Sequence, residues 1–332
     1  MEDQAHAHYK EKRYRLADFF NAHWEAYLRA PKKPVTEDQF RAVNALRTCR
    51  TEALGVRVYA CPECGQVVEA YHSCKHRFCP ACSWRETLVW ADKAHAKMAD
   101  VPHRHVVATL PHALNPLLKA NYRLMSNMLL RASAETLKDW MGAKHGLLPG
   151  IMSVQHTFGE QKNWHHHAHS IATWGGLDPK TGKIVALPHK FVPFGFLGQK
   201  FRIKFEDLLV AAFDGQRLSH RFSGRRAFMR FVKKINRHAW TYHIEPPMEE
   251  TGQVIRYIGR YSKRFCLSER KITSMGKGYI SFTYKDYKDK AANGRPKEKE
   301  CRLHYSDFFP RLLQHVPPKG FQAVRYYGLY AN

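Results

Sequence analysis

Apolar residues recur with the spacing of amphipathic helices in several parts of the chain. Pro31 closes one such pattern in residues 12–29, formed by Tyr14, Leu16, Phe19, Phe20, Trp24, Tyr27 and Leu28. The pattern predicts a helix that ends before the proline. Thr36 and Gln39 are typical of a capping box that begins a second helix. Similar patterns predict further helices over residues 115–141, 196–213 and 225–240.

Short runs rich in β-branched and aromatic residues predict strands between these helices. They cover residues 104–110, 151–158, 164–174 and 279–287, and the third runs into a turn at Gly175-Gly176. Residues 288–300 indicate a charged loop, followed by a short helix and a final strand near residues 321–326. The interspersed helices and strands, without a glycine-rich phosphate loop, favour an α+β fold and argue against a nucleoside triphosphatase.

The charge balance indicates the class of partner. The 332 residues include 54 Lys and Arg against 29 Asp and Glu, which gives a net charge of +25, and 44% are hydrophobic. No apolar run is long enough to cross a bilayer, and the charged N-terminus lacks a signal-peptide core. We therefore expect a soluble, intracellular protein of two domains with a polyanionic partner, and nucleic acid is the leading candidate.

Two cysteine pairs have the spacing of zinc ligands. Cys61-x2-Cys64 and Cys79-x2-Cys82 are separated by 14 residues, close to the spacing of a zinc ribbon. A reducing interior disfavours disulfides, so these four cysteines predict a closed, structural Zn2+ site. Cys74, with Cys49, His72 or His76, either contributes to a second site or is a plain thiol. We expect a helical, zinc-ribbon-like domain over residues 1–98 and a second domain over residues 99–332.

The third predicted strand carries four histidines within five residues. Side chains alternate between the faces of a strand, so His165, His167 and His169 share one face and His166 points to the other. Neighbours on one face lie about 6.6–7 Å apart at Cα, so two adjacent histidines can bind one metal. The spacing allows 165/167 or 167/169. A histidine-rich surface strand is the simpler interpretation.

Two tyrosines downstream suit chemistry on a phosphodiester. Tyr257 and Tyr261 lie one turn apart on a predicted helix, and Gln253 continues their stripe. Core packing of an amphipathic helix is the alternative. Hydroxyl nucleophiles among cations nevertheless fit attack on a phosphate. The basic residues around them, and on the predicted helix 225–240, are candidate DNA contacts: Arg256, Arg260, Lys263 and Arg264, with Arg230, Lys233 and Lys234.

Taken together, these segments resemble the rolling-circle transposases of the insertion sequence ninety-one family, within the HUH endonuclease superfamily. They occur in the family's order over roughly residues 45–332. The matching residues are Cys61-x2-Cys64, Ser73-Cys74-x4-Cys79-Pro-x-Cys82, His105-Val-Val-Ala-Thr-Leu-Pro-His-x-Leu-Asn115, His165-x-His167-x-His169, Arg256-Tyr257-x3-Tyr261, Tyr284-Lys285-Asp286-Tyr287, Lys319-Gly-Phe321 and Tyr327-Gly-Leu329-Tyr-Ala-Asn332.

The resemblance implies an HUH domain, an antiparallel sheet with flanking helices, that acts on single-stranded DNA at transposon ends and at the target. His167 and His169 would be the HUH pair that holds Mg2+ or Mn2+. Gln253 is the candidate third ligand, with His156 and Glu160 as rivals. Tyr257 and Tyr261 would be the two nucleophiles, which form a 5′-phosphotyrosine and release a 3′-OH. The implied location is the cytoplasm of a bacterium, with the nucleoid.

Two departures from the family pattern concern a second zinc and leave the first unaffected. Gly55-Val56-Arg57 stands where the family has Gly-Gly-His, and Phe78 stands where it has His. Two alternative functions remain beside the transposase. One is a replication initiator or relaxase with the same chemistry, and the other is a zinc-dependent DNA-binding protein without catalysis.

Overall fold

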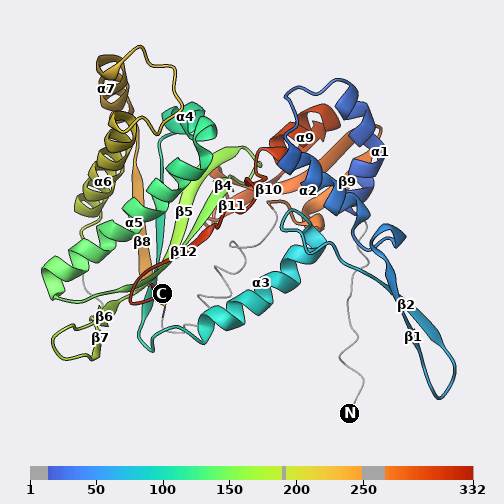
Figure 1. Ribbon diagram of the computed structural model, residues 1–332, viewed down its shortest axis with the longest axis horizontal. Helices are drawn as coiled ribbons and strands as arrows, with labels where there is room; N and C mark the ends of the chain where they lie inside the picture. The colour runs from blue at the N-terminus through green and yellow to red at the C-terminus, as the bar shows by residue number, and fades with distance from the viewer. Residues whose placement is uncertain (1–13, 189–191, 249–265, 332) are drawn as a thin grey trace. The chain divides into compact units, whose positions relative to one another are not determined.

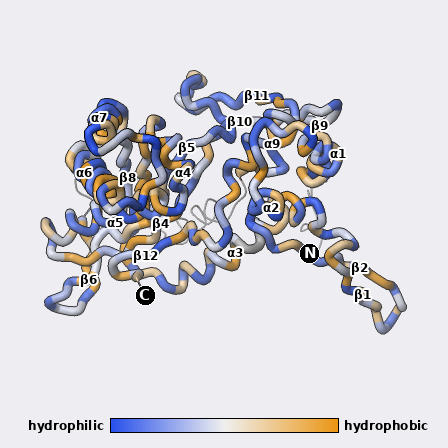
Figure 2. The backbone as a smooth tube through the Cα atoms, turned by 45° about the horizontal axis from the view of Figure 1, so that its top comes forward, coloured by the Kyte–Doolittle hydropathy of each residue, from blue (hydrophilic) through white to orange (hydrophobic). Residues whose placement is uncertain are grey.

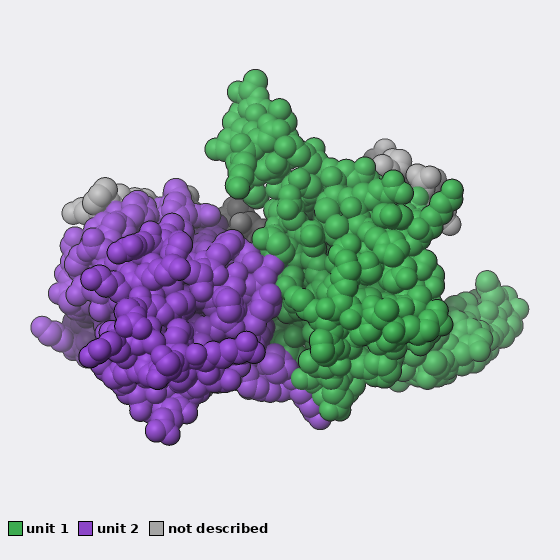
Figure 3. All heavy atoms as spheres, turned by 90° about the horizontal axis from the view of Figure 1, so that it is seen from above, with its two compact units in different colours: residues 1–84, 159–163, 264–317 green, residues 85–158, 164–263, 318–332 purple. Residues whose placement is uncertain are grey.

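The chain divides into two compact units, each assembled from segments that are distant in sequence. The computed structural model describes residues 14–188, 192–248 and 266–331. Unit 1 contains residues 1–84, 159–163 and 264–317, and unit 2 contains residues 85–158, 164–263 and 318–332 (Figure 3). The chain therefore passes between the units several times. The division into domains at residue 98 stays a prediction.

Unit 1 has a helical part (Figure 1), and its core is rich in aromatic side chains. Its helices are α1 (Leu16–Arg29), α2 (Glu37–Thr48) and α9 (Tyr305–Leu313), with 3-10 turns at Glu52–Leu54 and Glu269–Lys271. The first two helices are confirmed, and Thr36 and Gln39 form the capping box that begins α2. Phe309 of α9 stacks on Phe20 of α1 with ring centroids 4.3 Å apart. The apolar stripe of α1 therefore packs against a helix almost 300 residues later in the sequence.

Unit 1 also contains two small antiparallel sheets. One has the order β11-β10-β9 and consists of β9 (Ile272–Gly276), β10 (Tyr279–Lys290) and β11 (Pro296–His304). The charged loop predicted at 288–300 is confined to a turn at residues 291–295, and the rest of that range is strand. Charged residues pair across this hairpin. Lys299 contacts Asp286 and Asp289 at 2.8 and 3.0 Å. Opposite charges on neighbouring strands thus extend the hairpin into a range where the sequence predicted a loop.

The other sheet is the hairpin of β1 (Val56–Ala60) and β2 (Val67–Tyr71). Every residue of its two strands is exposed. Its apolar residues appear as orange segments of the backbone tube in Figure 2, and Val58 retains 59% of its accessible surface.

Unit 2 is organised around a five-stranded sheet of order β12-β4-β5-β3-β8 in which all neighbours are antiparallel. Its strands are β3 (His103–Thr109), β4 (Gly150–Phe158), β5 (Trp164–Thr173), β8 (Thr241–Met248) and β12 (Val324–Gly328). The α+β fold with an antiparallel sheet is confirmed. The predicted turn at Gly175-Gly176 is instead part of a short strand, β6 (Gly175–Leu177), which pairs with β7 (Ile184–Ala186).

Helices cover one face of this sheet and form the main core with it. They are α4 (Asn115–Ala120), α5 (Tyr122–His145), α6 (Phe194–Asp214) and α7 (Arg225–Ile235), preceded by a 3-10 turn at His112–Leu114. The single helix predicted over 115–141 is broken at Asn121. Its side-chain amide donates hydrogen bonds to the carbonyls of Leu117 and Ser219 at 2.9 and 2.8 Å. These bonds join the break to the segment between α6 and α7.

The opposite face of the sheet carries the histidines and is partly covered by α3 (Pro80–His95). Ala91 and Ala94 of α3 pack on Met152, Val154 and Ile171. Because side chains alternate along each strand, Met152 and Val154 share their face with His156 on β4. The register pairs Ile171 with both Met152 and His105. One surface of the sheet thus holds an apolar region beneath α3 and a polar region beyond it.

Candidate functional site

Three histidines from two neighbouring strands converge on the polar region of this sheet face. His156 of β4 is the register partner of His167 on β5. Together with His169, they offer nitrogen atoms that all lie within 4.8 Å of one another. The Nε2 atoms of His167 and His169 are 3.0 Å apart. This spacing allows three imidazoles to bind one cation.

Hydrogen bonds at the far side of each ring fix which nitrogen faces the cluster. Nδ1 of His167 lies 2.9 Å from the carbonyl oxygen of His165, so it carries the proton and donates. Nδ1 of His169 lies 2.8 Å from Nε2 of His105. Nδ1 of His105 in turn lies 3.2 Å from a carboxylate oxygen of Glu245 on β8. A proton on each Nδ1 is compatible with all three contacts and leaves a lone pair on Nε2 of both His167 and His169.

Burial keeps these rings neutral. It lowers the pKa of His167 to about 3, with a further contribution from His165. It also lowers the pKa of His169 well below its usual value, and the neighbouring His156 acts in the same direction. A neutral imidazole is the form that binds a metal. The donor set therefore fits a divalent cation at physiological pH.

Three other residues on or near the histidine strand, His165, His166 and Glu160, are not part of the cluster of three histidines. His165 pairs with His112, with 3.1 Å between Nδ1 and Nε2, and is not part of the cluster of three. His166 points to the opposite face of the strand, as predicted, and is buried there within 3.4 Å of Ser126 and Gln155. Glu160, a rival for the third metal position, forms an ion pair with Lys271 at 3.0 Å within unit 1.

Several predicted site residues fall outside the described residues. These are Gln253, Arg256, Tyr257, Arg260, Tyr261, Lys263 and Arg264. Their roles stay predictions. Among the described residues, His156, one of the two rivals for the third ligand, lies with the predicted pair. The sequence offered it as a candidate, but its place opposite His167 depends on the register of β4 and β5.

A second cluster joins four cysteines of unit 1. The Sγ atoms of Cys49, Cys74, Cys79 and Cys82 lie within 4.8 Å of one another. Sγ of Cys82 is 3.4 Å from that of Cys49 and 3.6 Å from that of Cys74, too far for disulfides. Hydrogen bonds from the Cys74 and Cys79 thiols lower the pKa of Cys82, which favours the thiolate form that binds metal. Four clustered cysteine sulfurs are a ligand set of structural zinc sites, in which the ion is bound by four ligands in tetrahedral geometry.

This cluster differs by two members from the predicted set of Cys61, Cys64, Cys79 and Cys82. Cys61 and Cys64 lie in the turn that joins β1 to β2, where Cys61 N–H donates to Gln66. Five residues of strand separate that turn from the base of the hairpin, about 17 Å of chain. Cys49 and Cys74 flank the base, which is closed by the bond from Arg50 N–H to the His72 carbonyl. Residues that bracket a hairpin meet, whereas those at its tip do not.

One of the predicted basic helices is described. In α7, Phe228, Val232 and Ile235 are buried in the core, while Arg230, Lys233 and Lys234 are exposed. The helix therefore presents three cations on the side opposite its packing face. Their contact with DNA stays a prediction.

Comparison with known proteins identifies the family to which the chain belongs. A family model described as "Putative transposase" matches residues 150–332, and a "Transposase zinc-binding domain" model of the insertion sequence ninety-one type matches residues 19–110. The first match spans the histidine cluster, and the second spans the cysteine cluster. The chain belongs to this family of transposases, as the sequence indicated.

Two curated relatives whose names describe transposases match this chain over most of their own length. "Putative transposase y4qJ" of Sinorhizobium fredii is 34% identical over 325 residues, which cover 96% of this chain and 80% of that protein. "Transposase for insertion sequence element IS801" of Pseudomonas savastanoi pv. phaseolicola is 28% identical over 305 residues, covering 89% and 70%. No solved structure matches the chain. No helix in the described part of the chain is long and apolar enough to span a membrane.

Proposed function

We propose that this transposase nicks and rejoins single-stranded DNA at element ends through a tyrosine–phosphate intermediate, in rolling-circle transposition. The observation that carries the proposal is the cluster of His156, His167 and His169 on one face of the sheet. Their ring nitrogens would hold one divalent cation, with His156 as the third ligand in place of Gln253. When bound, that cation would offset charge on the phosphoryl oxygens of the scissile phosphate.

The chain's own residues orient and hold this arrangement. Nε2 of His105 accepts a hydrogen bond from Nδ1–H of His169. The other nitrogen of His105 lies beside the Glu245 carboxylate. The His165 carbonyl likewise accepts a hydrogen bond from Nδ1–H of His167. Both ligand rings are thus fixed in orientation before any cation binds, which lowers the cost of ordering them. Three nitrogen donors favour Mn2+ over Mg2+, since Mg2+ prefers oxygen ligands.

The covalent step is assigned to Tyr257 or Tyr261. The phenol oxygen attacks the scissile phosphorus, the bond to the 3′ oxygen breaks, and the phenol proton is lost while the 3′-OH leaves. The resulting 5′-phosphotyrosine retains the energy of the phosphodiester, so rejoining needs no ATP. A second tyrosine gives the protein a means of accepting a second strand.

The test is formation of a covalent adduct with labelled single-stranded DNA of an element end, in the presence of Mn2+. We expect a denaturant-resistant adduct with the wild-type chain and none with the double variant Tyr257→Phe/Tyr261→Phe. Tyr287→Phe, an exposed tyrosine on β10, is the matched control and should keep the adduct. An adduct of normal yield in the double variant would overturn the proposal.

The adduct assay and a strand-transfer assay on element ends separate two alternative functions from the transposase. A zinc-dependent DNA-binding protein without catalysis would form no adduct with any variant. A replication initiator or relaxase would form the adduct but would fail to transfer a strand between element ends. The family match favours the transposase.

The cysteine cluster has a separate role in the proposal. We infer that Zn2+ bound by Cys49, Cys74, Cys79 and Cys82 holds the end of α2 to the start of α3. Such closed sites stabilise a fold and leave no position for substrate. The exposed cations of α7 would contact phosphates, in keeping with the net charge of +25. A bacterial cytoplasmic location with the nucleoid follows from the proposed substrate.

A further inference from the structure

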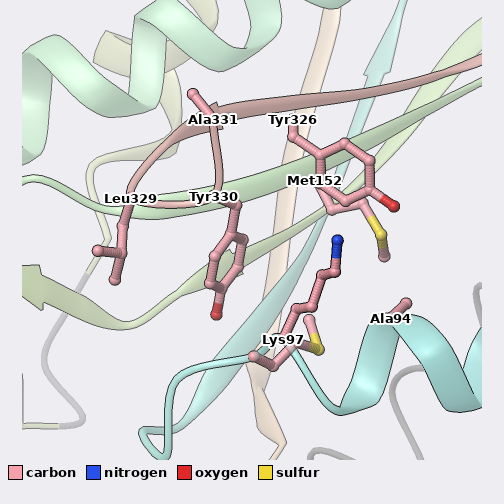
Figure 4. A pocket seen from close by; sticks show the side chains of 8 residues that line it. Ala94, Lys97, Met152, Tyr326, Leu329, Tyr330 and Ala331 are labelled. Atoms are coloured by element: carbon pink, nitrogen blue, oxygen red, sulfur yellow. The ribbon is translucent and has the colours of Figure 1, made fainter.

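The face of the sheet that carries the histidine cluster also contains a cavity of about 250 Å³ within unit 2 (Figure 4). It lies between Met152 of β4, the segment after α3, and the C-terminal turn after β12. Met152 and His156 are four residues apart on the same face of β4, about 13 Å. The cavity is therefore a near neighbour of the cluster on one surface.

The wall formed by the C-terminal turn is fixed by close backbone contacts. Gly328 has φ +60° and approaches Pro149 so closely that a Cβ atom would lie 1.9 Å from its carbonyl oxygen. Leu329 N–H donates to that carbonyl at 3.0 Å. The ring of Tyr330 lies against Gly150, where a Cβ atom would be 2.7 Å away. Only glycine at these two positions permits this approach of the turn to β4.

Hydrogen bonds fix the Tyr330 hydroxyl as well. Its oxygen accepts the Ala99 N–H at 3.1 Å and lies 2.7 Å from Nε2 of His103. Burial lowers the pKa of His103 to about 4, so the ring is neutral and its Nε2 can accept the Tyr330 proton. The polar atom of the tyrosine is therefore held by the protein on two sides. Such a pre-formed wall is typical of ligand pockets.

The lining combines aromatic and apolar surface with one cation. Tyr326 keeps 38% of its surface exposed. Lys97 is exposed, and its side chain extends along the cavity toward Met152 and Tyr326 in Figure 4. Among the described residues, no carboxylate lies within ion-pair distance of Lys97. An aromatic surface beside a cation with no carboxylate partner in the described part of the chain matches a planar base attached to a phosphate.

We propose that this cavity binds one unstacked nucleobase of the single-stranded DNA, with Lys97 contacting an adjacent phosphate. The inference rests on the proposed function and adds a subsite to it. The cavity is below the usual range of ligand pockets, about 300–1,000 Å³, which suits a single ring system. It also gives a role to the motif Tyr327-Gly-Leu329-Tyr-Ala-Asn332, which the catalytic proposal leaves unused. Leu329, Tyr330 and Ala331 of that motif line the cavity.

The test compares two single-stranded probes that differ only in their bases. Fluorescent oligothymidylate of twelve nucleotides and an abasic oligomer of the same length are titrated with the full chain, without added Mg2+ or Mn2+. No chelator is used, so that bound zinc is retained. We expect wild-type protein to prefer the base-bearing probe. Tyr326→Leu should lose about 5- to 150-fold of that preference, the range for one stacked base, and bind the abasic probe normally.

Lys97→Ala should weaken the binding of both probes and reduce the slope of log K against log salt by about 0.7. Tyr326→Trp keeps an aromatic face and should retain the preference. Lys93→Ala on α3 and Tyr287→Leu on β10 lie outside the cavity and should behave as wild type. Equal preference for the base-bearing probe in wild type and Tyr326→Leu would overturn the inference. That result would be expected if the cavity accepts an apolar peptide instead.

Photocrosslinking gives a readout that a folding defect cannot imitate. An oligothymidylate substituted with 5-iodouracil should attach to Tyr326 or Tyr330, and attachment only elsewhere would contradict the proposal. Adduct formation by Tyr257 and Tyr261 is measured on the same variants at saturating DNA. If wild type forms no adduct, the catalytic proposal fails while base preference is still measured. If the adduct forms and Tyr326→Leu keeps full preference, only the subsite fails.

Discussion

A histidine that binds a cation through one ring nitrogen almost always donates the proton of its other nitrogen to a partner, which fixes the orientation of the ring. Glu245 and His105 provide this for His169, because the contacts of 2.8 and 3.2 Å run from ring to ring to carboxylate. Removal of such an outer partner typically costs 10- to 100-fold in metal affinity. At the residue scale, we therefore expect the proposed cation site to depend on a glutamate that is not itself one of the three clustered ligands.

We expect Glu245→Ala to raise the dissociation constant for Mn2+ by about 10- to 100-fold. Glu245→Gln should have a smaller effect, since its amide oxygen can still accept from His105 without the charge. The measurement is Mn2+ titration followed by electron paramagnetic resonance, which does not depend on activity. Glu298→Ala, an exposed glutamate on β11, is the control. Unchanged Mn2+ affinity in Glu245→Ala would contradict the relay.

Buried histidines also make the fold sensitive to acid. Burial lowers the pKa of His103 to about 4, and the pKa values of His166 and His167 to about 3. In the unfolded chain these groups titrate near 6.5, so below that pH the unfolded state binds more protons. Stability present above pH 6.5 is then lost as the pH falls toward the folded values. Each histidine contributes up to about 1.4 kcal/mol per pH unit.

Urea unfolding without added divalent cation checks this sign. The free energy of unfolding should be similar at pH 8 and 7, and should fall at pH 6 and again at pH 5. His103→Gln should give a shallower fall, while His238→Gln, an exposed residue, should match wild type. A free energy of unfolding that is constant from pH 7 to pH 5 would be inconsistent with neutral buried histidines.

At the scale of elements, the β1–β2 hairpin decides which cysteines meet. It brings Cys49 and Cys74 together at its base and carries Cys61 and Cys64 to its tip. We expect Cys74→Ser to lose bound zinc and to be destabilised by roughly 3 kcal/mol or more, about 6–12 °C in Tm. Cys61→Ser should retain the zinc. The measurement is zinc content by elemental analysis together with Tm, and loss of zinc in Cys61→Ser alone would reverse the assignment.

Elements with a local signal could be predicted from sequence. The capping box of α2, the stripe of α1 and the alternation of β4 and β5 each depend on neighbouring residues. Strand β8 contains Pro246-Pro247, which argues locally against a strand. Its place at the edge of the sheet next to β3 permits it. Similarly, the cross-strand pairs of Lys299 and the contribution of His156 depend on register, which a single sequence does not provide.

At the scale of the whole molecule, the chain path limits what the sequence could reveal. Residues 264–317 belong to the same compact unit as the N-terminal helices, and Phe309 completes the aromatic core of α1. No local pattern in either segment indicates the other. The predicted pair of His167 and His169 was less affected by this chain path, because the clustered histidines lie on adjacent strands of one sheet within unit 2.

The net charge of +25 would favour binding of any polyanion, so the role of α7 must be separated from that general attraction. We expect Arg230→Ala/Lys233→Ala/Lys234→Ala to weaken binding of oligothymidylate and to reduce the slope of log K against log salt by up to about 2, from about 0.7 per lost phosphate contact. Lys144→Ala/Lys180→Ala/Lys183→Ala removes the same charge from other exposed positions. If binding depends only on total charge, the two triple variants will show the same slope. If α7 touches the DNA, only the first will be shallower, and the yield of covalent adduct at saturation will be unchanged in both.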